Sequence, residues 1–201
     1  AYGGFAISAP HGSEAFDDIA HRGPVAHQLD GHRHGLGTLV ARADHPFASA
    51  VHAPLAGIVV AMETRAAAVQ GGRSLCIVIE GDGSDRIDDS VRPVKDPASL
   101  GPEELVRRLR EAGIAGLGGA GFPASTKLAS ARDLGAHTLV LNGAECEPWI
   151  CCDDALMRSA ADDIVLGALI LQRAAGAVRC VIAIEDDKPA AIAAVTRAIE
   201  R

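Results

Sequence analysis

The sequence has few aromatic residues, no long apolar run and no excess of positive charge. Aromatic residues make up 3% of the 201 residues, so any core must be built mainly from Ala, Val, Leu and Ile. The formal net charge is −7, which argues against a nucleic-acid partner because a phosphate backbone calls for a basic surface. No apolar stretch is long enough to span a bilayer, and the first residues do not resemble a signal peptide. We therefore expect a globular chain that reaches a membrane only through a partner subunit.

The cysteines show no recognisable framework. There are five of them, an odd number, and the four-cysteine spacing that binds an iron–sulfur cluster is absent. Cys146, Cys151 and Cys152 lie close together, but adjacent cysteines cannot easily face one tetrahedral ion and no histidine pair lies nearby in sequence. We expect neither a disulfide framework nor a metal site.

Residues 1–90 have the pattern of a β-rich domain. Short apolar runs at 38–41, 51–60 and 75–79 are separated by Gly and Pro, which predicts short strands in a small sandwich or barrel. Residues 53–59 look like the turn of biotinyl and lipoyl carrier domains, which present a lysine for modification. Residues 43–72 contain no lysine, so we predict a carrier-like, barrel-sandwich scaffold without an attached cofactor.

Residues 103–201 alternate helix and strand, after a Gly-, Asp-, Ser- and Pro-rich linker at 81–102. The pattern predicts a helix at 102–110, a buried strand at 138–141, one long helix at 154–175, a strand at 180–184 and a final helix opened by Pro189. Gly113 and Gly176 are natural helix stops. This order favours a parallel sheet covered by helices, so the fold class is α/β, with the β-rich domain followed by a Rossmann-like domain.

A glycine-rich segment follows the first predicted helix, with five glycines in residues 113–121. It contains a literal G-x-G-x-x-G at Gly116, Gly118 and Gly121, but a Rossmann fingerprint must follow a strand and here a helix precedes it. The glycines still allow the backbone to approach a flat ring or a phosphate closely and to form an anion-binding nest. Lys127 could add a point charge. The alternative is a glycine-rich connection with no ligand.

An acidic turn follows the predicted strand at 138–141 and reads Asn142, Gly143, Ala144, Glu145, Cys146, Glu147 and Pro148. Ligands of α/β sheets bind at the carboxyl ends of parallel strands. Asn142 offers donors and an acceptor to the polar edge of a flavin or a ribose, and Glu145 and Glu147 offer acceptors. The alternative is an ordinary acidic surface turn.

The motifs in this order resemble those of the C subunit of the bacterial Rnf electron-transport complex and, more distantly, of the flavin-bearing subunit of respiratory complex I. They are GLGGAGFP at 116–123, NGAECEP at 142–148, CDD at 152–154 and IED at 184–186 with Lys188 and Pro189. Leu117 and Ala144 stand where complex I flavin subunits carry Arg and Asp, which agrees with the Rnf branch. Residues 49–54 and 76–80 resemble the N-terminal domain of that family.

The resemblance implies an FMN that accepts hydride from NADH and passes electrons singly to iron–sulfur clusters. Carried over residue by residue, the flavin would be lined by Gly116, Gly118, Gly119 and Ala120. Lys127 would meet its phosphate side, and Asn142 and Glu145 its polar edge. Phe122 would stack near the nicotinamide or adenine, and Glu147 would lie at the NADH entrance. No catalytic side chain is required, because the chemistry belongs to the flavin.

The resemblance also implies partners and a location: other subunits of an Rnf-type complex, indirect exchange with ferredoxin, and a peripheral place on the cytoplasmic side of the inner membrane. Family members continue past residue 201 with more of the flavin site and two cysteine motifs for iron–sulfur clusters. We therefore expect this chain alone to bind FMN weakly or not at all. Two alternatives remain: a docking or assembly module with a degenerate flavin fold, and a flavoprotein related to cobalamin-reducing enzymes.

Overall fold

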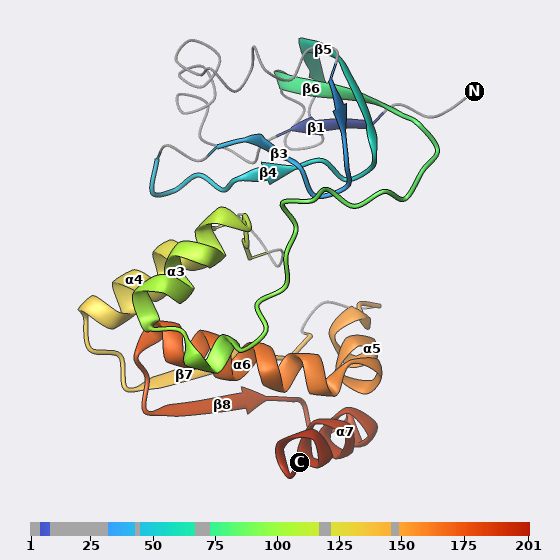
Figure 1. Ribbon diagram of the computed structural model, residues 1–201. Coiled ribbons are helices and arrows are strands. Elements are labelled where there is room, and N and C mark those ends of the chain that lie inside the picture. Colours follow the sequence, from blue (N-terminus) through green and yellow to red (C-terminus); the bar gives the residue numbers. More distant parts are fainter. Residues whose placement is uncertain (1–4, 9–31, 43–44, 67–72, 117–121, 146–148) are drawn as a thin grey trace. The chain divides into compact units, whose positions relative to one another are not determined.

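The computed structural model describes residues 5–8, 32–42, 45–66, 73–116, 122–145 and 149–201. The chain divides into two units, which we describe separately: Ala1–Lys95 with Arg107–Lys127, and Asp96–Val106 with Leu128–Arg201. The helices α3 (Pro102–Glu111) and α4 (Ala124–Asp133) each contribute residues to both units (Figure 1).

The first unit contains an antiparallel sheet of four strands in the order β1-β6-β5-β2. These strands are β1 (Phe5–Ser8), β6 (Arg73–Gly81), β5 (Gly57–Ala66) and β2 (Arg33–His34). The strands β3 (Leu39–Ala41) and β4 (Val51–His52) form a second, two-stranded sheet. The strands expected around 38–41, 51–60 and 75–79 are confirmed. As the composition required, their core is aliphatic, with Val40, Val59, Ile77 and Ile79 at its centre.

The segment after β6 is fixed to the first unit by one carboxylate. Asp88 accepts hydrogen bonds from the Ser90 hydroxyl and backbone N–H at 2.5 and 3.0 Å, and from the Thr38 hydroxyl at 2.7 Å. These bonds, led by that of the Ser90 side chain, lower the pKa of Asp88 to about 2. The backbone N–H of Asp88 also donates to the carbonyl of Leu36, which pairs with Ile87. The first part of the expected linker, up to residue 91, is therefore attached to the body of the unit.

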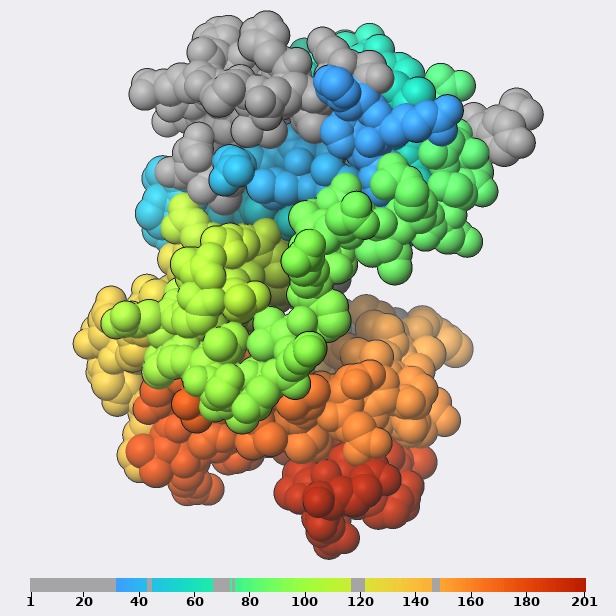
Figure 2. All heavy atoms as spheres, in the orientation of Figure 1, coloured from blue at the N-terminus to red at the C-terminus, as the bar shows by residue number. Residues whose placement is uncertain are grey.

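The second unit is built on the parallel strands β7 (Thr138–Asn142) and β8 (Arg179–Ala183). Between them run α5 (Cys152–Ser159) and α6 (Ala161–Ala175), and α7 (Pro189–Ile199) follows β8. Helix α6 contacts both strands, and α7 packs on α5 and α6, as the adjoining orange and red segments of Figure 2 show. Met157, Ala191 and Val195 form its buried centre. The parallel pairing and the α/β class are confirmed.

Two sequence expectations about this unit are wrong. The helix expected at 154–175 is interrupted at Ala160, whose φ of −135° leaves the helical region. A second helix begins there because Asp162 and Asp163 favour a helix N-terminus. The strand expected to be buried is half-open: Val140 is 60% exposed, since helices cover only one face of β7 among the described residues.

The ends of α3 and α6 follow the same pattern, with Gly113 and Gly176 at φ +67° and +68°. In each, the N–H of the glycine and that of the next residue donate to carbonyls of the last helical turn. This is the Schellman motif, which confirms both predicted stops. Gly113 has a second constraint, because a Cβ built on it would overlap the carbonyl oxygen of Ala50.

Gly113 and Gly135 provide a matched pair for separating these two effects. Gly135 ends α4 at the same φ of +67°, but a Cβ there meets no atom within 4 Å. We expect Gly135→Ala to cost about 1 kcal/mol through backbone strain alone. Gly113→Ala adds the overlap with Ala50, so its loss should be several times larger in denaturant unfolding. Equal losses would contradict a close approach at Gly113.

Candidate functional site

The predicted site residues fall in both units. Gly116, Phe122 and Lys127 belong to the first, and Asn142 and Glu145 belong to the second. Gly118, Gly119, Ala120 and Glu147 lie outside the described residues. The geometry of each half of the site is therefore given within its own unit.

The base of the glycine segment is closed by backbone pairing. The N–H of Gly116 donates to the carbonyl of Phe122 at 3.0 Å, and the N–H of Ala124 donates to the carbonyl of Ile114 at 2.9 Å. Ala115 and Pro123 form an antiparallel bridge between these two bonds. Residues 114–116 and 122–124 therefore run side by side and bring the two ends of the segment together.

Helix α4 begins directly after this base, at Ala124, and the sequence pattern did not predict it. Its apolar residues are spread around its circumference, so the sequence shows no amphipathic pattern that would predict this helix. Pro123, immediately before the first helical residue, was the available signal. The glycine segment thus does lead into a helix N-terminus, where backbone N–H groups and the helix dipole favour a phosphate. Lys127 is exposed in the first turn of the same helix.

Gly116 is exposed at the base of the glycine segment. Among the described residues, the nearest atom to a Cβ built on Gly116 is the carbonyl oxygen of Phe122, at 3.9 Å. Phe122 is 40% exposed at the other side of the base. Packing against the described residues therefore does not require the missing side chain of Gly116.

The second half of the site lies at the carboxyl end of β7. Asn142 is the last residue of the strand, and its side-chain Oδ1 accepts the N–H of Ala144 at 3.2 Å. This hydrogen bond involves only the carbonyl oxygen of the Asn142 amide. Among the described residues, its Nδ2 group remains available to donate to another acceptor. The N–H of Gly143 donates to the carbonyl of Ala183 at 2.8 Å, which ties the turn to the end of β8.

Glu145 binds the start of helix α5. Its Oε1 accepts the N–H of Asp153 at 2.7 Å, and its Oε2 accepts the N–H of Asp154 at 3.1 Å. The Cys152 thiol also donates to Oε1, at 3.5 Å. The N-cap residue of α5, Cys151, makes no side-chain capping bond. The carboxylate of Glu145, which lies outside the helix, caps its N-terminus instead. The sequence pattern had indicated only a ligand-binding role for these oxygens.

The surroundings of Glu145 favour its charged form. Partial desolvation raises its pKa, but the N–H groups of Asp153 and Asp154, the Cys152 thiol and the charge of Lys188 together outweigh this effect. The net result is a pKa below the ordinary value for Glu. Glu145 is therefore ionised at neutral pH and holds α5 against the end of β7.

A residue of the IED motif to which the sequence analysis assigned no role also lies at this edge. Glu185 follows β8, and its Oε2 accepts the N–H of Glu145 at 3.4 Å. Its position after the second parallel strand, equivalent to that of the 142–145 turn after the first, was the signal that could have found it. The corner thus combines one amide with several carboxylates.

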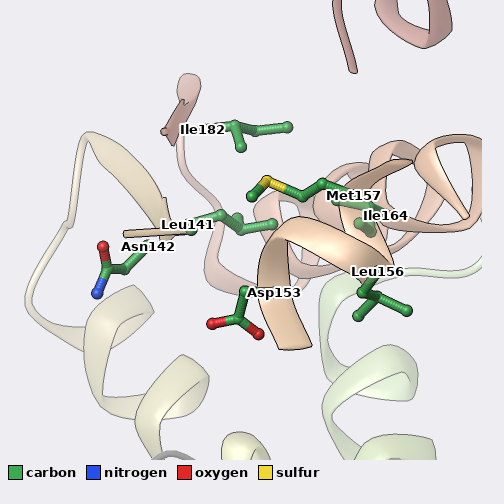
Figure 3. A pocket seen from close by; sticks show the side chains of 8 residues that line it. Leu141, Asn142, Asp153, Leu156, Met157, Ile164 and Ile182 are labelled. Carbon is green, nitrogen blue, oxygen red and sulfur yellow. The ribbon is translucent and has the colours of Figure 1, made fainter. Parts of the chain in front are cut away.

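An apolar cavity of about 180 Å³ opens beside Asn142. Its lining is Leu141, Asn142, Gly143, Asp153, Leu156, Met157, Ile164 and Ile182. In Figure 3, the side chains of Leu141, Met157 and Ile164 lie close together along its wall, while the polar groups of Asn142 and Asp153 point away from them. The strand end therefore offers an apolar wall next to hydrogen-bonding groups.

Glu145, Cys152 and Asp153 also form the one group among the described residues whose ligand atoms lie near enough together for a metal ion, within 4.8 Å. Burial and the neighbouring carboxylates of Glu145 and Asp153 raise the pKa of the Cys152 thiol above its ordinary value. The hydrogen bonds of Glu145 to the start of α5 bring these three side chains together.

Comparison with known proteins first defines the class of the chain. Residues 109–201 match the family model of the Nuo51 FMN-binding domain. The matched range includes the glycine segment of the first unit and the β7–β8 corner of the second. In the described part of the chain, no helix has both the length and the apolar character needed to cross a membrane.

The most similar relatives include proteins named as the C subunit of an ion-translocating oxidoreductase complex. That of Serratia proteamaculans is 45% identical over 74% of this chain and 21% of its own length. That of Rhodobacter capsulatus is 41% identical over 80% of this chain and 31% of its own length. That of Pseudomonas aeruginosa is 43% identical over 81% of this chain and 21% of its own length. These matches confirm the resemblance to the C subunit of the Rnf complex. The chain matches only about a fifth to a third of the length of these relatives.

Replacement of Glu145 by Ala tests its structural role. The variant should unfold at a lower temperature than the parent at neutral pH, because the two N–H groups at the start of α5 lose their acceptor. Since the folded-state pKa is lowered, the stabilisation exists above the ordinary Glu pKa and is lost as the pH falls through the lower, folded value. The difference between the two proteins should therefore shrink on acidification.

Thermal unfolding at a series of pH values measures this effect. Glu200→Ala is the matched control, since Glu200 is exposed next to α7 and its side chain makes no hydrogen bond or ion pair with described residues. A difference between Glu145→Ala and the parent that does not change with pH would contradict the ionised cap.

Proposed function

We propose that this chain is the flavin- and NADH-binding part of an electron-transfer subunit that oxidises NADH within an Rnf-type, membrane-associated complex. The relatives are named as subunits of ion-translocating oxidoreductase complexes. Residues 109–201 match the family model of an FMN-binding domain. In this proposal the chain acts at the cytoplasmic side of the inner membrane, held by other subunits, and reaches ferredoxin only through them.

The described residues fit an FMN in chemical terms. A flat, phosphorylated cofactor needs close backbone approach, donors for its phosphate and polar partners for its ring edge. The backbone of Gly116 is exposed, α4 presents its N-terminus, and Lys127 adds a positive charge. Asn142 offers amide hydrogens to a ring carbonyl, beside the apolar wall of the β7 cavity. Gly118, Gly119 and Ala120, which lie outside the described residues, would also line the flavin, as the resemblance implies.

The distribution of charge favours one orientation of the cofactor. The corner after β7 and β8 carries the carboxylates of Glu145, Asp153 and Glu185, which would repel a phosphate. Carboxylates accept hydrogen bonds from hydroxyl and ring N–H groups instead. We therefore assign the phosphate to the α4 side and the polar ring edge to the Asn142 side. Glu145 acts there through its hold on α5 as well as through its charge.

The bound FMN would accept a hydride from NADH and release electrons one at a time. In the proposal Phe122 stacks near a ring of the dinucleotide, and Glu147 lies where NADH enters. The protein supplies binding and orientation, and no side chain needs to act as acid, base or nucleophile. Iron–sulfur clusters that take the electrons belong to parts of the relatives that this chain does not match.

We propose two domains with the boundaries expected from the sequence, 1–90 and 103–201. The first serves as a barrel-sandwich scaffold of carrier-like shape. Its β4–β5 segment, residues 51–66, contains no lysine for cofactor attachment. The observation that carries the functional proposal is the exposed backbone of Gly116 close to the start of α4, within the range that matches an FMN-binding domain.

Addition of FMN at millimolar concentration to the chain tests this proposal, because binding by this part alone is expected to be weak. Amide NMR signals should shift first at residues 113–116, 122–127 and 142–145. Gly116→Ala should weaken FMN binding about tenfold while leaving stability nearly unchanged, since the nearest described atom to its Cβ is the Phe122 carbonyl oxygen at 3.9 Å. The readout is the titration curve of the shifting signals.

Gly167→Ala is the matched control, because Gly167 lies within α6 and a Cβ there meets no described atom within 4 Å. It should bind FMN like the parent. Shifts confined to other residues, or equal FMN affinity in the parent and Gly116→Ala, would refute the assignment of the flavin to the glycine segment.

A further inference from the structure

Two of the few aromatic side chains of this protein are exposed and in contact. The sequence contains four Phe, one Tyr and one Trp. Phe47 is 61% exposed and Phe122 is 40% exposed. Their ring centroids lie 5.7 Å apart, with the ring planes tilted by 56°. Phe122 belongs to the base of the glycine segment, whereas Phe47 comes from the strand-rich N-terminal part.

The turn that carries Phe47 is held in place by several bonds within the first unit. The N–H of Phe47 donates to Nδ1 of His45 at 3.2 Å, and the two rings lie 5.4 Å apart. The Thr126 hydroxyl of α4 donates to the carbonyl of Pro46, and Arg110 of α3 donates to the carbonyl of His45 at 3.3 Å. Residues on both sides of the glycine segment therefore fix the position of this turn.

An exposed phenylalanine gains little of the stabilisation that burial of its apolar surface would give. Stacking by a flat ligand would cover this apolar surface. Aromatic faces bind flat heteroaromatic rings, and a platform at the surface suits a ligand that must arrive and leave in each cycle. A tightly held cofactor does not have this requirement.

We infer that Phe47 and Phe122 together form the stacking platform for a heteroaromatic ring of the dinucleotide substrate, with His45 fixing the Phe47 ring. The inference rests on the proposed NADH-binding function and adds to it a binding residue from the N-terminal part. It assigns that part a direct role at the substrate site, in addition to its role as a scaffold.

The test compares Phe47→Leu and Phe47→Trp with the parent chain. Leucine keeps apolar packing against Phe122 but removes the ring, whereas tryptophan keeps a flat ring. Binding of NADH, AMP, nicotinamide mononucleotide and FMN is measured for each protein by ligand-observed NMR. Val60→Ala, which shortens an exposed apolar side chain on β5 in the same unit, is the matched control. Thermal unfolding confirms that each variant is folded.

We expect Phe47→Leu to weaken NADH binding about tenfold, with FMN binding unchanged, and Phe47→Trp to restore it. The fragment that weakens in parallel, AMP or nicotinamide mononucleotide, identifies the ring that stacks. Equal NADH affinity in the parent and Phe47→Leu would overturn the inference while leaving FMN binding as a separate result. An absence of NADH binding to the parent chain would also overturn it, whereas the FMN titrations test the proposed function separately.

Discussion

Because β7 and β8 run parallel, their carboxyl ends open on one edge of the sheet, and the rest of the second unit depends on this arrangement. It brings the turn at 142–145 next to Glu185, and the Gly143–Ala183 hydrogen bond holds the two strand ends together. Glu145 then binds the N-terminus of α5. The connection from β7 to β8 therefore begins at this same edge. The wall of the β7 cavity follows, since α5 supplies Asp153, Leu156 and Met157 to its lining.

The two regions that carry predicted site residues, each within its own unit, differ in their electrostatics. Near the glycine segment, the start of α4 and the charge of Lys127 favour an anion. Around the end of β7, carboxylates favour hydroxyl and N–H donors, with Asn142 as the donor among them. A nucleotide-like cofactor has both characters, an anionic phosphate at one end and a polar ring edge at the other.

Much of the fold could be predicted because its signals are local. Pro102 with the following acidic residues marked the start of α3, Gly113 and Gly176 marked helix ends, and short β-branched runs marked β6 and β8. Predictions that depended on tertiary surroundings were less successful. The burial of Val140 depends on what covers its face, and the helical periodicity of 154–175 continues through the break at Ala160.

The same distinction applies to the site. The residue types of the 142–145 turn indicated a polar strand end, but Glu145 capping a helix eight residues away involves a contact that sequence periodicity does not encode. Helix α4 was missed because its residues lack an amphipathic stripe and glycines precede it. Phe47 gave no signal in the sequence, since its importance comes from contact with Phe122, 75 residues further along the chain.

The central claim is the proposal that the matched domain binds FMN through the glycine segment. An experimental structure of the protein with bound FMN measures this most directly. The account predicts the phosphate beside the start of α4, with the backbone of Gly116 in contact with the cofactor. An FMN bound elsewhere in the protein, or aliphatic side chains packed against Gly116, would contradict it.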